Sequence, residues 1–194
     1  MYQSLLSDTS FFSLLLRIDQ DLAQQARAGG CPWCGGVLHR ACYRRKPRGG
    51  PARLAREHAE RFSFCCSVEG CRRRATPASV RFLGRKVFFA VVVLLVPVLR
   101  DGPRPERMRR LEELFTVDRR TLGRWRRWWR EIVPATRFWC AARGRFRRPV
   151  AEDSLPGSLL GAFRGEEGLA AQVLAVLAWL APLTGTTALA GGVF

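Results

Sequence analysis

Residues 104–133 read RPERMRRLEELFTVDRRTLGRWRRWWREIV, and the interpretation of the whole chain starts from this stretch. Apolar residues at helical spacing predict one helix over about residues 105–115 and a second over about residues 119–132. A short turn, Thr116-Val117-Asp118, separates them, and the Asp118 carboxylate is suited to cap the second helix. The pattern predicts a helix-turn-helix. The alternative is a pair of packing helices with solvated charges.

The second helix of this pair has two contrasting faces. Its predicted buried stripe consists of Leu122, Trp125, Trp129 and Ile132. The opposite face carries six arginines, with Thr121 near the leading end: Arg119, Arg120, Arg124, Arg126, Arg127 and Arg130. A dense guanidinium surface on a capped helix is what reading DNA in the major groove requires. We expect Arg119, Arg120, Thr121, Arg124 and Arg127 to contact DNA.

The net charge of the 194-residue chain is +17, and most of it lies in the middle. Residues 40–148 hold 30 Lys and Arg against nine acidic residues, whereas both flanking segments are slightly acidic. Such a block indicates a polyanionic partner, nucleic acid first and an anionic membrane surface second. Arginine outnumbers lysine 31 to 2, which suits bidentate phosphate contacts, although a GC-rich genome produces the same bias.

Four of the seven cysteines have the spacing of metal ligands. The pairs are Cys31-x-x-Cys34 and Cys66-x4-Cys71, which predict a tetrahedral zinc site of the zinc-ribbon type. Cys65 competes with Cys66, but neighbouring strand residues point to opposite faces. We expect Cys65 to alternate outward with Ser63, leaving Cys66 as the ligand. Unpaired buried cysteines are the alternative, and a thioredoxin-like redox pair lacks its βαβ context.

Two arginine-rich segments flank these cysteines. The Pro/Gly-rich loop between the ribbon halves contains Arg44, Arg45, Lys46 and Arg48, and Arg72, Arg73 and Arg74 directly follow the second cysteine pair. We expect both segments to contact nucleic-acid phosphates, with solvated charge runs as the alternative. His39 and Cys42 lie near the first pair, but a site with four cysteines does not need them.

The remaining segments complete a prediction of an α+β, mainly α protein. Residues 1–29 form the N-terminal segment, with one amphipathic helix over residues 8–28, residues 30–80 form a small β zinc ribbon, and residues 81–148 form a three-helix, helix-turn-helix bundle. The apolar stretch 87–99 is too short to span a bilayer and is expected to be the buried helix of that bundle. Residues 149–194 form an acidic linker and an apolar helical segment that docks on the core or on a partner chain. No secretory signal is visible, so we place the protein in the cytoplasm.

Catalysis requires a constellation of reactive groups that this sequence does not show. It contains no Gly-rich phosphate loop, no serine elbow and no spaced carboxylate triad for two-metal chemistry. The acidic residues of the middle segment occupy positions that helix caps and pairing with arginine explain. We therefore expect a binding protein and not an enzyme.

Residues 31–132 resemble a known group of proteins. CPxCGGxLHR, then FxFCCSxxGCRRRxTP, then RRTLGRWRRWW is similar to the zinc-ribbon and helix-turn-helix portions at the front of bacterial insertion-sequence transposases and of small mobile-element-associated proteins. The resemblance implies DNA binding, with Cys31, Cys34, Cys66 and Cys71 as zinc ligands and the helix from Arg119 as the reader. The transposase catalytic domain has no counterpart here. Double-stranded DNA, a separately encoded transposase and a second copy of the chain are the partners expected.

Two other hypotheses remain open from the sequence. An RNA-binding or ribosome-associated zinc ribbon would use the same basic loop. A membrane-associated interaction protein would use the uncharged segment from Gly168 to the end of the sequence. Competition between RNA and duplex DNA distinguishes the first from DNA binding, and truncation at Gly157 tests the second.

Overall fold

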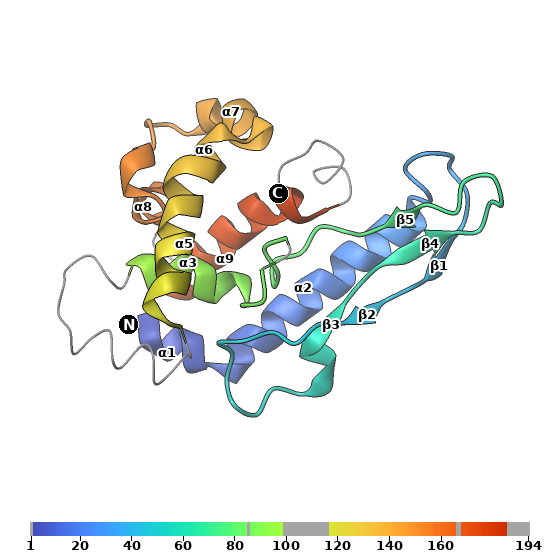
Figure 1. Cartoon of the computed structure of the whole chain (residues 1–194), viewed down its shortest axis with the longest axis horizontal. Coiled ribbons are helices and arrows are strands. Elements are labelled where there is room, and N and C mark those ends of the chain that lie inside the picture. Colours follow the sequence, from blue (N-terminus) through green and yellow to red (C-terminus); the bar gives the residue numbers. More distant parts are fainter. Residues whose placement is uncertain (1, 85, 99–116, 166–167, 186–194) are drawn as a thin grey trace.

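The computed structural model describes residues 2–84, 86–98, 117–165 and 168–185. Within these ranges the protein is a mixed α+β structure in which helices prevail over a few short antiparallel strands (Figure 1). The predicted α+β, mainly α class is therefore confirmed. The first helix of the predicted helix-turn-helix, residues 105–115, lies outside the described residues.

The strands form two small antiparallel sheets. β1 (Leu38–Arg40), β4 (Phe64–Cys66) and β5 (Arg74–Ala75) form one sheet in the order β1-β4-β5, and β2 (Tyr43–Arg44) pairs with β3 (Glu60–Arg61). In the larger sheet, His39 lies opposite Cys65 and Cys65 opposite Arg74. The alternate positions Leu38, Phe64, Cys66 and Ala75 are buried together. One face of this sheet is consequently apolar and covered, and the row of His39, Cys65 and Arg74 belongs to the other.

The long helix α2 (Thr9–Ala28) joins the two halves of the protein. It begins at Asp8, whose carboxylate accepts a 2.8 Å bond from the Ser10 amide, and it ends at Gly29. This agrees with the helix predicted over residues 8–28. Its first half is buried in the helical core, while Leu16 and Ala23 pack with the residues of the β1-β4-β5 sheet. Figure 1 shows α2 extending from the helices along the strands.

Helix α3 (Ala90–Val98) is the centre of the helical half. Every side chain from Ala90 to Pro97 is buried, because α1 (Tyr2–Ser7), α5 (Arg119–Arg127) and α9 (Leu169–Leu180) all contact this helix. The buried helix predicted within residues 87–99 is therefore present. Completing this half are a π-helical turn (Trp128–Ile132), α6 (Val133–Ala135), α7 (Arg137–Ala142) and α8 (Gly157–Ala162).

Helix α5 begins as the sequence predicts. The Asp118 carboxylate accepts a 2.5 Å bond from the Thr121 amide, and the indole of Trp129 donates a 3.0 Å bond to the Val93 carbonyl of α3. The predicted stripe is wrong at its last position, since Ile132 is 44% exposed and Val133 is buried instead. Two steps of four residues lead from Trp125 to Trp129 and Val133, and the π-helical turn at Trp128–Ile132, which has more residues per turn than an α-helix, moves the buried position one residue beyond Ile132.

The C-terminal described segment docks on the core, as expected of the apolar helix. The buried side of α9 consists of Val173, Val176, Leu177 and Leu180. In the described part of the chain, no helix has the length and apolar character needed to cross a membrane. Residues 149–157 form more than a linker, because the Glu152 carboxylate accepts a 2.7 Å bond from the Trp139 indole and pairs with Arg143. Cys140 is exposed, and its thiol lies 3.6 Å from the Pro134 carbonyl.

A buried ion pair connects α2 to the rest of the structure. Asp19 and Arg81 have fully buried side chains, and the carboxylate Oδ2 lies 2.8 Å from the Arg81 Nε. Asp19 also accepts bonds from the Ser79 hydroxyl and the Val80 amide. The Arg81 guanidinium donates three further bonds, to the carbonyls of Glu57, His58 and Glu60. The desolvated charges are thus almost completely hydrogen-bonded, as burial requires.

A second buried arginine fastens the C-terminal segment. Arg61 Nη2 donates to the carbonyls of Pro77 and Thr184, and the Thr184 hydroxyl accepts a 2.7 Å bond from the Ser79 amide. Burial lowers the pKa of Arg61 to about 10. Residues 181–185 are therefore held on the same polar network as Asp19 and Arg81.

We expect Asp19→Ala to lower the free energy of unfolding by about 3–5 kcal/mol, because it leaves the buried Arg81 without its counter-ion. Urea unfolding followed by circular dichroism measures this change. The matched control is Arg40→Ala, which removes a surface pair with Glu60 in which the arginine side chain is 66% exposed. That change should cost less than about 1 kcal/mol. Equal losses from the two variants would contradict a dominant role for the buried pair.

Candidate metal centre and basic surface

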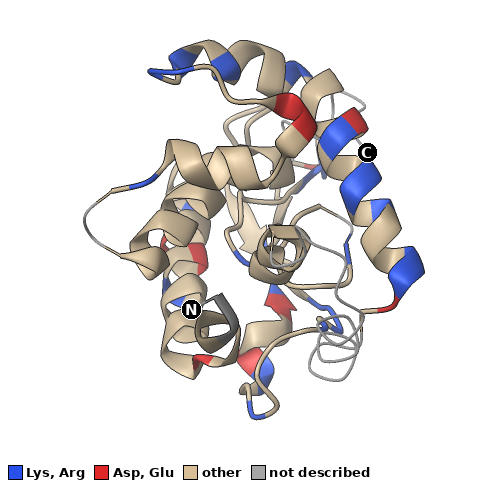
Figure 2. Cartoon of the chain, turned by 90° about the vertical axis from the view of Figure 1, so that its left-hand side faces the viewer, with Lys and Arg blue, Asp and Glu red and all other residues tan. Residues whose placement is uncertain are grey.

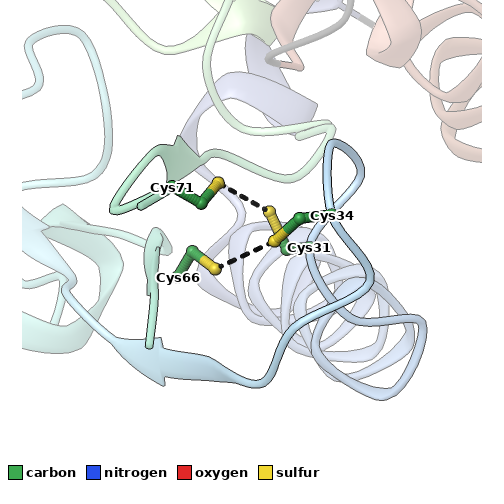
Figure 3. A group of neighbouring side chains, drawn as sticks. All are labelled: Cys31, Cys34, Cys66 and Cys71. Carbon is green, nitrogen blue, oxygen red and sulfur yellow. Dashed lines mark hydrogen bonds between the residues drawn. The ribbon is translucent and has the colours of Figure 1, made fainter. Parts of the chain in front are cut away.

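Four cysteine sulfurs converge where the end of α2 meets the β1-β4-β5 sheet (Figure 3). Cys31 and Cys34 come from the loop after α2, Cys66 ends β4, and Cys71 lies in the turn before β5. The sulfurs lie within 4.8 Å of one another, with 3.4 Å between Cys34 and Cys66 and 3.7 Å between Cys31 and Cys71. Tetrahedral thiolates about 2.3 Å from a zinc ion would be about 3.8 Å apart. The cluster could therefore hold a metal ion.

The first cysteine loop depends on glycine. The Gly35 amide donates to the Cys31 carbonyl and the Cys31 amide to the Gly36 carbonyl, both at 2.8 Å. Gly35 adopts φ +71°, a conformation that other L-residues rarely adopt. A Cβ on Gly36 would come within 2.5 Å of the Val68 side chain and 3.2 Å of the Cys66 sulfur. Gly36 thus allows the two cysteine loops to close on each other.

Backbone amides point at all four sulfurs. The donors lie two residues further along the chain, and Cys31 receives a second bond from the next cysteine: Trp33 and Cys34 bond Cys31, Gly36 bonds Cys34, Val68 bonds Cys66 and Arg73 bonds Cys71. Burial raises the pKa of Cys31, but the Trp33 and Cys34 amides and the neighbouring thiols outweigh it and set the pKa at about 7. The amide dipoles favour the thiolate, the form in which cysteine binds metal, although burial and the neighbouring thiols raise the pKa of Cys34, Cys66 and Cys71.

The second cysteine loop turns at Arg72. Arg72, and not the nearby Gly70, adopts a left-handed backbone, at φ +43°. The amides of Cys71 and Arg72 both donate to the Val68 carbonyl at 3.0 Å. This arrangement turns the chain so that Cys71 faces the cluster and Arg72 faces solvent.

The structure separates Cys66 from the cysteines and histidine near it. Cys66 lies in the cluster, whereas the Cys65 thiol lies 3.4 Å from the Arg72 carbonyl. The alternation of strand residues therefore predicted correctly that Cys66 lies in the cluster. The same alternation was wrong for Ser63, which does not point outward with Cys65 but is fully buried. Cys42 lies 3.7 Å from the Ser63 carbonyl, and His39 is exposed. Neither joins the four sulfurs.

Most of the predicted phosphate-binding residues of the ribbon are exposed: Arg44, Lys46, Arg48, Arg72, Arg73 and Arg74. Two of them lie over exposed aromatic rings. The Arg73 guanidinium is 5.6 Å from the Trp33 ring centre, and that of Arg74 is 5.8 Å from the Tyr43 ring centre. The ribbon surface thus combines positive charge with accessible aromatic faces.

Arg45 differs from the other predicted contacts because its side chain serves the fold. Its guanidinium donates to the Gly84 carbonyl at 2.8 Å and to the Lys86 carbonyl at 2.7 Å, and it lies 5.0 Å from the centre of the Phe82 ring. Burial lowers its pKa, which indicates a desolvated group. The prediction of Arg45 as a phosphate contact is therefore corrected: its guanidinium positions Gly84 and Lys86 instead.

The outer side of α5 carries the second basic surface, as Figure 2 shows. Its exposed residues there, continuing into the π-helical turn, are Arg119, Arg120, Arg124, Arg127 and Arg130. Thr121 was expected among the base contacts but is buried, and its hydroxyl accepts a 2.8 Å bond from Arg124. Thr121 therefore orients Arg124 instead of facing a partner. The Arg127 guanidinium is paired with Glu131 at 2.7 Å.

A groove beside α5 was missed from the sequence. Lys86, Val87 and Phe88 lie across it from α5 and Ile132. Lys86 directly precedes the apolar stretch 87–99 and is one of only two lysines among the 33 basic residues. A lysine among so many arginines could have drawn attention to position 86. The residues that face Lys86 lie at positions 121–132, however, and only the fold brings them near.

Comparison with known proteins adds no relative: no family model, no curated protein and no solved structure matches the chain. The resemblance to the front portions of insertion-sequence transposases therefore stays a prediction from the sequence motifs of this chain.

We expect Cys66→Ser to weaken metal binding by at least about a hundredfold, since it removes one of four thiolates from the cluster. Cys65→Ser, at the adjacent position, should leave binding unchanged. Titration with Co²⁺ and detection of the thiolate-to-cobalt absorption measure both variants. Loss of the cobalt spectrum in Cys65→Ser but not in Cys66→Ser would show that Cys65, and not Cys66, is the metal ligand.

Proposed function

We propose that this protein is a non-catalytic DNA-binding protein whose ribbon is held by a structural zinc ion. The observation that carries the proposal is the outer face of α5. This helix is capped at its start and anchored to the core, and its exposed arginines surround Gly123, which has no side chain. The four-cysteine cluster and the basic residues beside it also support the proposal, because they are suited to hold a metal ion and to contact phosphates.

Zinc fits the cluster better than other common metals. Soft thiolates favour Zn²⁺, Cu(I) or iron, whereas Mg²⁺ and Ca²⁺ take oxygen ligands. Four cysteines with no open coordination position are typical of structural zinc sites. The residues present therefore fit the ion: Cys31, Cys34, Cys66 and Cys71 would hold it, and it would link the end of α2 to β4 and the turn before β5.

The ribbon has little else to hold it together. Its strands have two or three residues each, and its apolar cluster is small compared with the core around α3. Sheets of this size are marginal without packing or a covalent or metal link. Bound zinc would thus contribute directly to the folding of residues 31–75.

We expect the purified protein to contain about one zinc ion per chain, and we expect chelation to loosen the ribbon selectively. Elemental analysis gives the stoichiometry. Amide hydrogen exchange after treatment with a chelator should accelerate in residues 31–44 and 61–75 but not in α3, which lies in the separate helical core. Unchanged exchange in the ribbon segments would contradict the structural role of the metal.

Helix α5 is suited to approach DNA because its orientation is fixed from within. The Asp118 cap defines its start, and Leu122, Trp125 and Trp129 hold it on the core, with the Trp129 indole bonded to α3. The exposed arginines therefore lie on a rigid face. In the proposed complex, Arg119, Arg120 and Arg124 approach base edges near the leading end, while Arg127 and Arg130 contact phosphates.

Gly123 lies in the middle of this face. It is exposed, and a Cβ added there would meet nothing within 4 Å, so packing does not require glycine. Glycine within a helix costs about 1 kcal/mol relative to alanine. The missing side chain lets the helix backbone approach a groove closely between the flanking arginines, which gives this otherwise unfavourable residue a use in binding.

The ribbon would provide phosphate contacts outside the reading helix. Arg44, Lys46, Arg48, Arg72, Arg73 and Arg74 are exposed and can neutralise phosphates without reading sequence. Binding through this many charges weakens steeply as the salt concentration rises. A separately encoded transposase and a second copy of the chain remain the protein partners that this proposal includes.

Gly123→Leu tests the proposed face directly. We expect it to stabilise the protein by up to about 1 kcal/mol, because leucine favours helix, and to weaken DNA binding by at least about tenfold, because its side chain obstructs the face. Gly161→Leu on α8, where a Cβ also meets nothing within 4 Å, is the matched control and should bind normally.

The binding measurement is selection from a random duplex library at physiological salt, followed by titration of the enriched sequence. Enrichment of one motif is the expected result, and inverted repeats within it would indicate a dimer. If Gly123→Leu is stabilised but binds the enriched duplex as well as the wild type, α5 is a packing helix and the reading role is wrong.

RNA is the second candidate, and one observation favours it. The exposed rings of Trp33 and Tyr43, each with an arginine above it, resemble surfaces on which unpaired bases stack. Competition between structured RNA and the selected duplex separates the two proposals. Replacement of both aromatic residues by alanine should impair RNA binding but not duplex binding.

A further inference from the structure

The groove beside α5 has an apolar floor and a positively charged rim. It has a volume of about 520 Å³ and lies between residues 86–88, α5 and the π-helical turn. Phe88 and Trp125 form its floor in an edge-to-face contact with ring centres 4.9 Å apart. Val87 and Ile132 leave 50% and 44% of their surfaces exposed beside it. Such an accessible apolar surface inside a groove is complementary to an apolar ligand.

Lys86 is the basic residue of the groove that forms no ion pair with an acidic group of the described chain and lies against an aromatic ring instead. The Lys86 ammonium lies 3.8 Å from the centre of the Trp128 ring, and in the described ranges no carboxylate forms an ion pair with it. Burial lowers the pKa of Lys86 to about 8, so its charge is poorly solvated. An anion placed beside this ammonium would replace the solvation that the lysine loses.

The position of Lys86 is fixed by its backbone. Its carbonyl accepts the 2.7 Å bond from Arg45, and its amide donates to the Leu83 carbonyl at 3.1 Å. Arg45 also bonds the Gly84 carbonyl, so the segment that carries Lys86 is held on both sides of residue 85. The ammonium is thus presented to the groove from a constrained loop, as a binding site requires.

We propose that this groove binds a small amphipathic anion, with a flat apolar body against Val87, Phe88 and Ile132 and one carboxylate, sulfonate or phosphate group beside Lys86. Arg124 adds a second positive charge to the rim: its guanidinium donates to the neutral Thr121 hydroxyl, and although it interacts electrostatically with Asp118 it forms no ion pair within 4 Å among the described residues. The volume falls within the range of about 300–1,000 Å³ that is usual for small-molecule sites. A long polyanion would not use the apolar floor.

The site would also couple to nucleic-acid binding. Arg124 and Arg127 line the groove and also belong to the proposed DNA-binding face. This consequence, unlike the site itself, rests on the proposed function: a bound anion would neutralise Arg124 and compete with DNA for it. The protein would then release DNA in response to the small molecule.

The chain allows a direct observation of the site, because Lys46 and Lys86 are its only lysines. Reductive methylation with ¹³C-formaldehyde labels these two side chains and the N-terminal amine, and the Lys86→Met and Lys46→Met variants assign the signals. The probe is 2-naphthoate and its neutral counterpart is 2-naphthamide. Titration at pH 6.5, below the pKa of about 8, keeps the Lys86 ammonium charged.

We expect 2-naphthoate to shift the Lys86 signal saturably, to leave the exposed Lys46 signal in place, and to bind at least about tenfold more tightly than 2-naphthamide. Isothermal titration should show that Lys86→Met removes this preference for the anion, whereas Lys86→Arg and Lys46→Met retain it. Circular dichroism confirms that each variant is folded.

Three results would overturn the site: no shift of the Lys86 signal, equal affinity for the acid and the amide, or an unchanged preference in Lys86→Met. These measurements contain no nucleic acid, so they stand even if the protein does not bind DNA. Adding the selected duplex is a separate step. If 2-naphthoate binds at Lys86 but does not displace the duplex, the coupling fails while the site remains.

Discussion

The ion pair between Asp19 and Arg81 is the interaction on which both halves of the protein depend. Asp19 lies near the middle of α2, between residues that pack into the helical core and residues that pack against the β1-β4-β5 sheet. Its partner Arg81 bonds the carbonyls of Glu57 and His58, just before β3, and that of Glu60, the first residue of β3. Because two buried charges are tolerable only when their hydrogen bonds are complete, this network fixes the angle between α2 and the strands.

The cysteine cluster holds the other end of the same helix. Gly29 and Gly30 end α2, and Cys31 follows at once, so the cluster joins the end of α2 to β4 and the turn before β5. With the proposed metal bound, the strands would be attached to α2 at two points, the ion pair in the middle of the helix and the cluster at its end. Two attachments on one rigid helix would define the ribbon's position relative to the helical core, although its strands are only two or three residues long.

Features that depend on residues close together in the sequence could be predicted, whereas features that depend on residues far apart could not. The bounds of α2, the Asp118 cap and the four cysteines depend on spacing within a few residues, and each could be read locally. Helical spacing places Asp19 among the apolar residues of α2, but its partner Arg81 lies 62 residues away and nothing local identifies it. The same limit explains Arg45, Thr121 and Ser63: each was placed on the surface from composition or alternation, but tertiary neighbours cover it.

The buried and half-buried arginines show that the high positive charge does not serve nucleic-acid binding alone. Arg45, Arg61 and Arg81 direct their guanidinium groups at backbone carbonyls, so part of the arginine excess serves the fold and not a partner. The same explanation does not extend to α5, whose outer arginines are exposed. Nor does it extend to Gly123, because a helix selected for packing and stability alone would carry alanine or a longer side chain at an exposed central position. An exposed glycine surrounded by arginines is instead consistent with a surface shaped to approach a polyanion closely.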